Sequence, residues 1–163
     1  MNAMEATTDD RGVALAMVAE NGLSLDFLPD HMRADKGIVL AAVVQDGWAL
    51  QFCSDDLKAD KEVVVAAVTS NGLALKYAAD NLKEDQDVVL AAVKQNGEAI
   101  RYAGFDFTAN RSIVLEAIRS NSSSILFAPK KLTKSKCWIP SIHPNQGMFY
   151  YLILSTKLKN YLS

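Results

Sequence analysis

Residues 60–84 read DKEVVVAAVTSNGLALKYAADNLKE, and residues 85–109 repeat the pattern as DQDVVLAAVKQNGEAIRYAGFDFTA. Each stretch begins with Asp, continues with a Val- and Ala-rich segment and then carries Asn-Gly at the same place. An exact tandem spacing of 25 residues is typical of a solenoid, in which each unit is stabilised by packing against its neighbours.

The same register continues on both sides of these two copies and covers residues 10–134 with five units and no insertion. A residue able to cap a helix opens each unit: Asp10, Asp35, Asp60, Asp85 and Asn110. A second column is glycine in four units and serine in the fifth: Gly22, Gly47, Gly72, Gly97 and Ser122. Because both columns keep their spacing, one local structure is expected five times.

Each unit is expected to open with a helix of about three turns. The carboxylate of the opening Asp can accept hydrogen bonds from free backbone N–H groups and lies at the positive end of the helix dipole. The glycine column is expected to end the helix, because the residue that follows a helix commonly takes the left-handed backbone conformation that glycine enters without strain.

Three apolar columns are expected to form the buried face of this helix, because their spacing is helical. The first is Val13, Ile38, Val63, Val88 and Ile113; the second is Leu15, Leu40, Val65, Leu90 and Leu115; the third is Val18, Val43, Val68, Val93 and Ile118. Small pairs such as Ala66-Ala67 would let neighbouring helices approach closely.

A shorter second segment follows the glycine and carries a Leu or Ile, an aromatic residue and a closing apolar residue, such as Leu75, Tyr77 and Leu82. It is expected to be helical and partly of the tighter 3₁₀ type, because Pro29 and Pro129 interrupt two of its copies. The unit is thus a compact helical hairpin. We predict an all-α fold, a short helical-hairpin solenoid (an α-α superhelix) of five repeats.

Other repeat families fit less well. Leucine-rich repeats have a similar length but need an L-x-L strand followed by a ladder Asn, whereas this unit has a V-x-x-A-V helix followed by Asn-Gly. Tetratricopeptide and ankyrin repeats are longer by about eight residues. These families are therefore not expected.

The two ends lie outside the repeat. Residues 1–9 are polar, show no pattern and are expected to be a flexible lead-in. From Ser135 the register fails, and residues 146–162 are expected to form an amphipathic helix. The atypical segment 135–163 would then cap the end of the stack, as terminal repeats usually must. A peripheral membrane or partner contact through this tail, and a foreign sequence that follows a truncation, stay open as alternatives.

The net charge of −2 conceals a strong asymmetry along the chain. Residues 1–109 hold eighteen acidic and nine basic residues, a net charge of −9, whereas residues 110–163 hold one acidic and eight basic residues, a net charge of +7. This polarity would orient an anionic partner at the C-terminal end or favour head-to-tail self-association. A solvated surface without a partner is the alternative.

The cellular location is expected to be the cytoplasm, with export into a host cell as the alternative. The chain has two cysteines, no apolar run long enough to cross a bilayer and no signal-peptide pattern at Met1 to Asp10.

Catalytic chemistry has little support in the sequence. Nucleophilic catalysis needs a base beside a Ser or Cys, and the only histidines, His31 and His143, have no convincing partner. Cys53 occupies an alanine column and is expected to be a buried, inert thiol, while Cys137 lies in the basic tail. The chain has neither a zinc-ligand spacing nor a phosphate-binding glycine loop. We expect no enzymatic activity, no metal, no cofactor and no small-molecule substrate.

The pattern D-x-x-V-V-L-A-A-V-x-x-N-G-x-A-L-x-Y-A-x-x-x-L-K resembles the repeat family known as domain of unknown function 4116. Residues 60–84 and 85–109 are the closest copies, and the resemblance extends from about Asp10 to Lys134. It implies multi-repeat proteins, some of them from intracellular bacteria that export proteins to a host, and it implies no activity. The first repeat departs from the pattern at Asp26 and Pro29, and the fifth lacks the glycine.

Columns that vary while the frame repeats are typical of an extended binding surface. Three columns of this kind are Glu20, Gln45, Ser70, Gln95 and Ser120; Ala19, Val44, Thr69, Lys94 and Arg119; and Asp26, Gln51, Lys76, Arg101 and Leu126. We predict a protein–protein interaction module that binds an unidentified protein through four exposed residues: Lys76, Lys94, Arg101 and Arg119. Tolerant surface without a partner is equally compatible with the variation.

Two other functions stay open. The chain could bind anionic surfaces through its basic C-terminal third, at Lys130, Lys131, Lys134 and Lys136. The partner would then be a membrane, contacted peripherally through the tail, or nucleic acid, which is less expected without aromatic residues interleaved on that surface. The chain could also be a fragment of a larger repeat array with no independent role.

Overall fold

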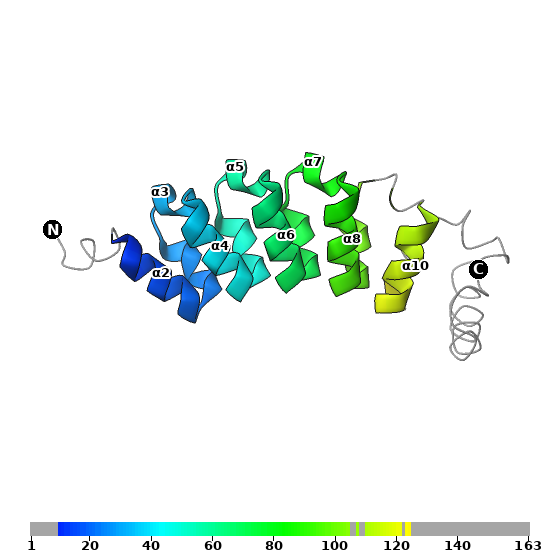
Figure 1. Cartoon of the computed structure of the whole chain (residues 1–163), viewed down its shortest axis with the longest axis horizontal. Helices are drawn as coiled ribbons and strands as arrows, with labels where there is room; N and C mark the ends of the chain where they lie inside the picture. The colour runs from blue at the N-terminus through cyan, green and yellow to red at the C-terminus, as the bar shows by residue number, and fades with distance from the viewer. Residues whose placement is uncertain (1–9, 105–106, 108–109, 122, 125–163) are drawn as a thin grey trace, which may run out of the picture.

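A computed structural model describes residues 10–104, 107, 110–121 and 123–124. Over these residues the chain forms a row of similar units along one long axis, from blue to yellow in Figure 1. All secondary structure in this part of the chain is helical, which confirms the predicted all-α repeat. The predicted lead-in at 1–9 and cap at 135–163 lie outside the described residues.

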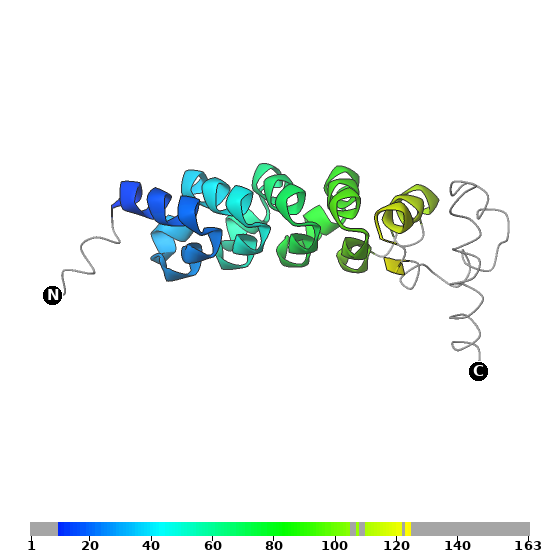
Figure 2. The ribbon, with the colours of Figure 1, turned by 90° about the horizontal axis from the view of Figure 1, so that it is seen from below.

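One layer of the solenoid consists of α-helices of ten residues each, one per repeat. They are α2 (Arg11–Glu20), α4 (Lys36–Gln45), α6 (Lys61–Ser70), α8 (Gln86–Gln95) and α10 (Arg111–Ser120). Each helix packs against the α-helix of the next repeat. Figure 2 shows these helices as one row above a second row of helical turns.

The second row consists of six-residue 3₁₀ helices. They are η1 (Gly22–Phe27), η2 (Gly47–Phe52), η3 (Gly72–Tyr77) and η4 (Gly97–Tyr102). Single α-helical turns follow the first three: α3 (Asp30–Arg33), α5 (Asp55–Lys58) and α7 (Asp80–Lys83). The second segment, predicted as one element, is therefore two in the first three repeats. The expected 3₁₀ helix occurs in all four of the repeats with η1 to η4, whether or not the repeat contains proline.

The predicted capping column is confirmed. Asp35 accepts hydrogen bonds from the backbone N–H groups of Gly37 and Ile38 at 2.8 and 3.1 Å. Asn110, the fifth member, accepts from Ser112 N at 3.0 Å. Each capping side chain satisfies N–H groups that have no partner within the helix, so it defines where the α-helix begins.

The explanation offered for the glycine column is wrong. None of the described residues has a positive φ, and the four described glycines of this column, Gly22, Gly47, Gly72 and Gly97, are each the first residue of a 3₁₀ helix. A Cβ on Gly72 would collide with the carbonyl oxygen of Ala92 and lie 3.0 Å from Gln95 Oε1, both in the next repeat. This column is glycine because the backbones of two successive repeats come into contact there. The residue before the glycine caps the 3₁₀ helix, since Asn71 Oδ1 accepts from Leu73 N at 3.1 Å.

The buried face of the α-helix also differs from the prediction. The first and third predicted columns are buried in the interior repeats, but the column of Leu40 and Leu90 is only partly buried. A column that the sequence analysis did not select is buried throughout: Ala14, Val39, Val64, Val89 and Val114. Because these helices contact neighbours on two sides as well as the 3₁₀ layer, the buried face is wider than one stripe.

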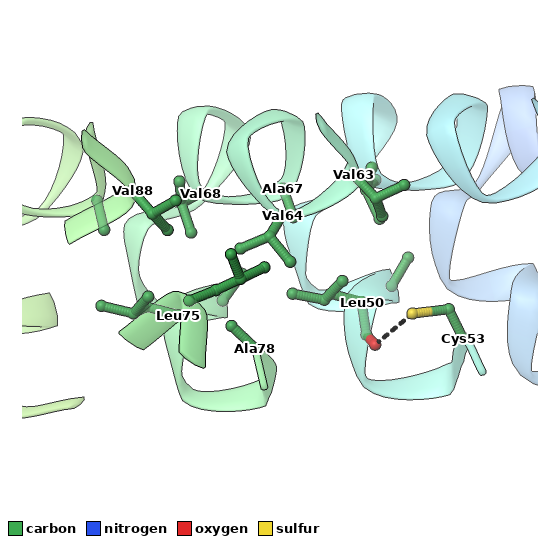
Figure 3. Close-up of a cluster of buried hydrophobic side chains, with 14 of the residues drawn as sticks. Leu50, Cys53, Val63, Val64, Ala67, Val68, Leu75, Ala78 and Val88 are labelled. Atoms are coloured by element: carbon green, nitrogen blue, oxygen red, sulfur yellow. Dashed lines mark hydrogen bonds between the residues drawn. The ribbon is translucent and has the colours of Figure 1, made fainter. Parts of the chain in front are cut away.

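The core runs continuously between the layers. Figure 3 shows Val64 and Val68 of α6 directed toward Leu75 of η3, with Leu50 of the preceding repeat beside them. Cys53 lies at the edge of this cluster, 3 % exposed, and its Sγ donates to the carbonyl oxygen of Leu50 at 3.1 Å. Burial raises the pKa of the Cys53 thiol to about 11, and the prediction that Cys53 is buried is confirmed.

Candidate interaction surface

A row of ion pairs joins successive repeats along the α-helical layer. The first residue of each of three helices contacts the capping Asp of the next repeat: Arg11 with Asp35 at 2.9 Å, Lys36 with Asp60 at 2.7 Å, and Lys61 with Asp85 at 2.8 Å. Lys36 also contacts Glu62 and Lys61 also contacts Asp87, at 2.8 and 3.3 Å. The helix starts are therefore occupied by contacts within the chain.

These contacts lower the pKa values of the capping carboxyl groups. The hydrogen bond from Arg11 is the main cause that lowers the pKa of Asp35 to about 2, with the Ile38 N–H next. Hydrogen bonds from Lys36 and Lys61 lower the pKa values of Asp60 and Asp85. The perturbed carboxylates thus have a structural cause, since they cap helices and join repeats.

One of the three columns expected to vary freely is a structural column. Gly72 N–H donates to Gln95 Oε1 of the next repeat at 2.6 Å, and Gly97 N–H donates to Ser120 Oγ at 3.0 Å. Gln45 and Ser70 accept in the same way from the glycines before them. Only Gln and Ser occur at these four positions, and each side chain supplies a hydrogen-bond acceptor to the N–H group of a buried glycine.

Lys76 and Arg101, from the third variable column, lie exposed on the 3₁₀ layer. The Nζ atom of Lys76 is 5.3 Å from the centroid of the Tyr77 ring, and the guanidinium carbon of Arg101 is 5.1 Å from the centroid of Tyr102. The same arrangement of cation and aromatic ring therefore occurs in two successive repeats.

Lys94 and Arg119, the other two predicted residues, lie exposed in the α-helical layer, near the ends of α8 and α10. Arg119 contacts Glu116 on its own helix at 3.5 Å. The four predicted side chains thus form two pairs, and each pair belongs to a different layer. The alternative anion-binding set, Lys130, Lys131, Lys134 and Lys136, lies outside the described residues.

Trp48 was not among the predicted site residues, yet it lies beside the Lys76–Tyr77 pair. Its ring packs against Tyr77 of the next repeat in an edge-to-face arrangement, with centroids 5.7 Å apart. The aromatic column at Tyr77 was visible in the sequence, but the column of Trp48 also holds Leu23, Leu73 and Glu98. No pattern in one sequence indicates that this variable position contacts the next repeat's aromatic residue.

The described residues hold no group of three His, Cys, Asp or Glu side chains that could bind a metal ion. The same part of the chain contains no helix long and apolar enough to cross a membrane. His31 is exposed on α3, as its variable column predicts.

Comparison with known proteins supports the repeat register. The model of a family described as Domain of unknown function (DUF4116) matches in four overlapping windows, at residues 10–58, 35–83, 60–108 and 85–133. Neither a curated protein nor a solved structure matches the chain. The windows advance by one repeat at a time and together cover most of the sequence, so the chain belongs to the DUF4116 family.

Proposed function

We propose that the chain is a non-enzymatic interaction module that binds a partner protein through the exposed surface of the 3₁₀ layer. The observation that supports this proposal is the repeated pair of a cation and a tyrosine ring, Lys76 with Tyr77 and Arg101 with Tyr102. The surface around these pairs, with Trp48, is called the η3–η4 surface below.

The aromatic rings restrict where the cations lie. A cation over an exposed ring gains about 0.5–1 kcal/mol, which is enough to favour a few side-chain conformations. A partner that binds an ordered side chain loses less conformational entropy than one that must order it. The rings themselves are only partly buried, so they also offer apolar area to the same partner.

The charges on this layer indicate the chemistry of the partner. The column changes along the stack from Asp26 through Gln51 to Lys76 and Arg101. An acidic segment would therefore be attracted to the η3–η4 surface and repelled at η1. We infer that the partner presents an extended segment with acidic residues, and that its direction along the stack is set by this gradient.

The division of the predicted residues between two layers provides a matched test. One variant carries Lys76→Glu and Arg101→Glu, and its control carries Lys94→Glu and Arg119→Glu, which makes the same change in net charge in the other layer. Each is immobilised beside the intact chain and exposed to lysate of the source cell, and retained proteins are quantified by mass spectrometry.

We expect one protein to be retained by the intact chain and by the Lys94/Arg119 variant but not by the Lys76/Arg101 variant. Equal loss with both variants would indicate a general effect of charge and would contradict the proposal, as would equal retention by both. Retention of nucleic acid or lipid alone would favour an anionic-surface binder instead. Circular dichroism would verify that both variants fold.

A further inference from the structure

The N-terminal end of the described stack exposes apolar side chains that the interior repeats bury. Phe27 is 76 % exposed, whereas Phe52, Tyr77 and Tyr102 in the same column pack against the core. Val13 is 38 % exposed, and its counterpart Ile38 is 1 % exposed. Both differences have one cause, since the described chain has no repeat in front of α2.

The interior repeats show what normally covers these positions. The Tyr77 ring lies against Trp48 of the preceding repeat, with 5.7 Å between centroids. The capping carboxylate of Asp35 is paired with Arg11, which also belongs to the preceding repeat. In the second, third and fourth repeats the N-terminal neighbour therefore supplies a cation for the capping Asp, and in the third it also supplies an apolar contact for the aromatic residue.

Asp10 has no such cation within the described part of the chain. Its carboxylate accepts from Gly12 N at 2.8 Å, and among the described residues no Lys or Arg is paired with it. Asp10, Val13 and Phe27 thus form an end surface that combines a carboxylate with exposed apolar area. We call it the N-terminal face. By the register of the other repeats, it is one half of a repeat interface.

We propose that the N-terminal face binds the basic C-terminal third of a second copy of this chain. The sequence supplies the complementary charges, because residues 1–109 carry a net charge of −9 and residues 110–163 carry +7. The contact is head-to-tail and joins two different surfaces. Each added copy leaves one free end of each kind, so such a contact continues into open chains or closes into a ring rather than stopping at a dimer with like faces paired.

The first test is sedimentation velocity of the intact chain at concentrations up to about 1 mM, where a buried aromatic residue and an ion pair give measurable association. We expect species larger than a dimer, which grow with concentration and become smaller as salt is added. A monomer over the whole range would overturn the proposal. So would a species that stops at a dimer, because two N-terminal faces would then pair with each other.

A pair of substitutions locates the surface. Phe27→Glu is expected to weaken association about 10- to 100-fold, because it replaces the apolar contact with a charge. Val44→Glu is the control, since Val44 is equally apolar and 66 % exposed but lies near the end of α4, away from the N-terminal face. It should leave association unchanged. Equal weakening by both variants would overturn the proposal.

Asp10→Asn tests the charge separately from the apolar contact. Asparagine still caps the helix, as Asn110 does, so the stability of the monomer should not change. We expect association to weaken roughly threefold at low salt and not at high salt, since an exposed ion pair contributes little. Unchanged association at low salt would contradict the assigned role of this carboxylate. Thermal melts of each variant would show that it folds.

Discussion

The first three interfaces between repeats differ from the fourth. In the first three, a cation at the start of one helix contacts the capping Asp of the next, as Lys61 contacts Asp85. At the fourth interface the same two positions hold Gln86 and Asn110, which are both neutral. The buried columns are nevertheless the same, because Ile113 and Ile118 are as buried as their counterparts in the three interior repeats.

The backbone contact is also kept at all four interfaces. Gly97 N–H donates to Ser120 Oγ at the fourth, as Gly22, Gly47 and Gly72 donate at the first three. The comparison indicates that apolar packing and the glycine contact define the stack, while the ion pairs adjust its stability.

The largest loss of stability is expected from Gly72→Ala. The new Cβ would collide with the carbonyl oxygen of Ala92, which cannot move without separating two repeats. We expect the free energy of unfolding to fall by about 3 kcal/mol, measured by urea denaturation. The control is Gly12→Ala, where the nearest atom is the carboxylate of its own capping residue at 3.2 Å. It should change stability by less than about 1 kcal/mol. Equal losses would show that glycine is not required by the close approach.

A smaller loss is expected from Gln95→Ala, which removes the acceptor of the buried Gly72 N–H group. Leaving that group without a partner should cost about 1–2 kcal/mol in urea denaturation. Glu20→Ala is the matched control, because Glu20 stands in the same column of the first repeat and its side chain accepts from no glycine among the described residues. If both variants lose the same stability, the column acts through helix propensity and not through this hydrogen bond.

Acid should weaken the first three interfaces more than the fourth, where the corresponding residues, Gln86 and Asn110, carry no charge. The pKa of Asp35 is about 2 in the folded chain and those of Asp60 and Asp85 are also lowered, so their contribution is complete above about pH 4. It is lost as the pH falls toward 2, when the folded carboxylates take up protons. Asp35→Asn should reduce the slope of stability against pH between 4 and 2. An unchanged slope would contradict the assigned role of Asp35.

The smallest effect is a gain of stability from the double change Gln86→Lys and Asn110→Asp, which supplies the ion pair that the fourth interface lacks. We expect the free energy of unfolding, from urea denaturation, to rise by about 0.5 kcal/mol at low salt and by less at high salt, because the pair is exposed to solvent. Each single variant is a control and should give less than the double. Additive singles, with no extra gain in the double, would show that the two residues do not interact.

Much of the fold could be predicted because the repeat amplifies weak local signals. One Asp before an apolar segment is weak evidence for a helix start, but four in exact register, with Asn110 completing the column, identify the cap. The 3₁₀ segment was expected for the wrong reason, since η3 forms without proline and begins where Asn71 caps it. The glycine was assigned to a left-handed conformation because a single sequence cannot distinguish a backbone requirement from a close contact.

The candidate surface was predicted less well. The sequence grouped Lys76 with Lys94 as variable cations, but it could not show that one lies on the 3₁₀ layer and the other on the α-helical layer. It also treated Gln95 as free surface, whereas the side chain accepts from a glycine of the preceding repeat. A cation directly after the capping Asp in three repeats was visible, yet its partner lies 24 residues away and depends on how the units stack.

The sequence by itself determined the length of the unit, the number of units, the helical class and the positions of the caps, because each of these depends on contacts within about one turn of chain. Only the tertiary structure decided which side chains are shared between repeats. The glycine that admits a neighbouring carbonyl, the Gln and Ser acceptors, the ion pairs and the uncovered Phe27 all depend on the distance and orientation of adjacent units, and no local pattern contains that information.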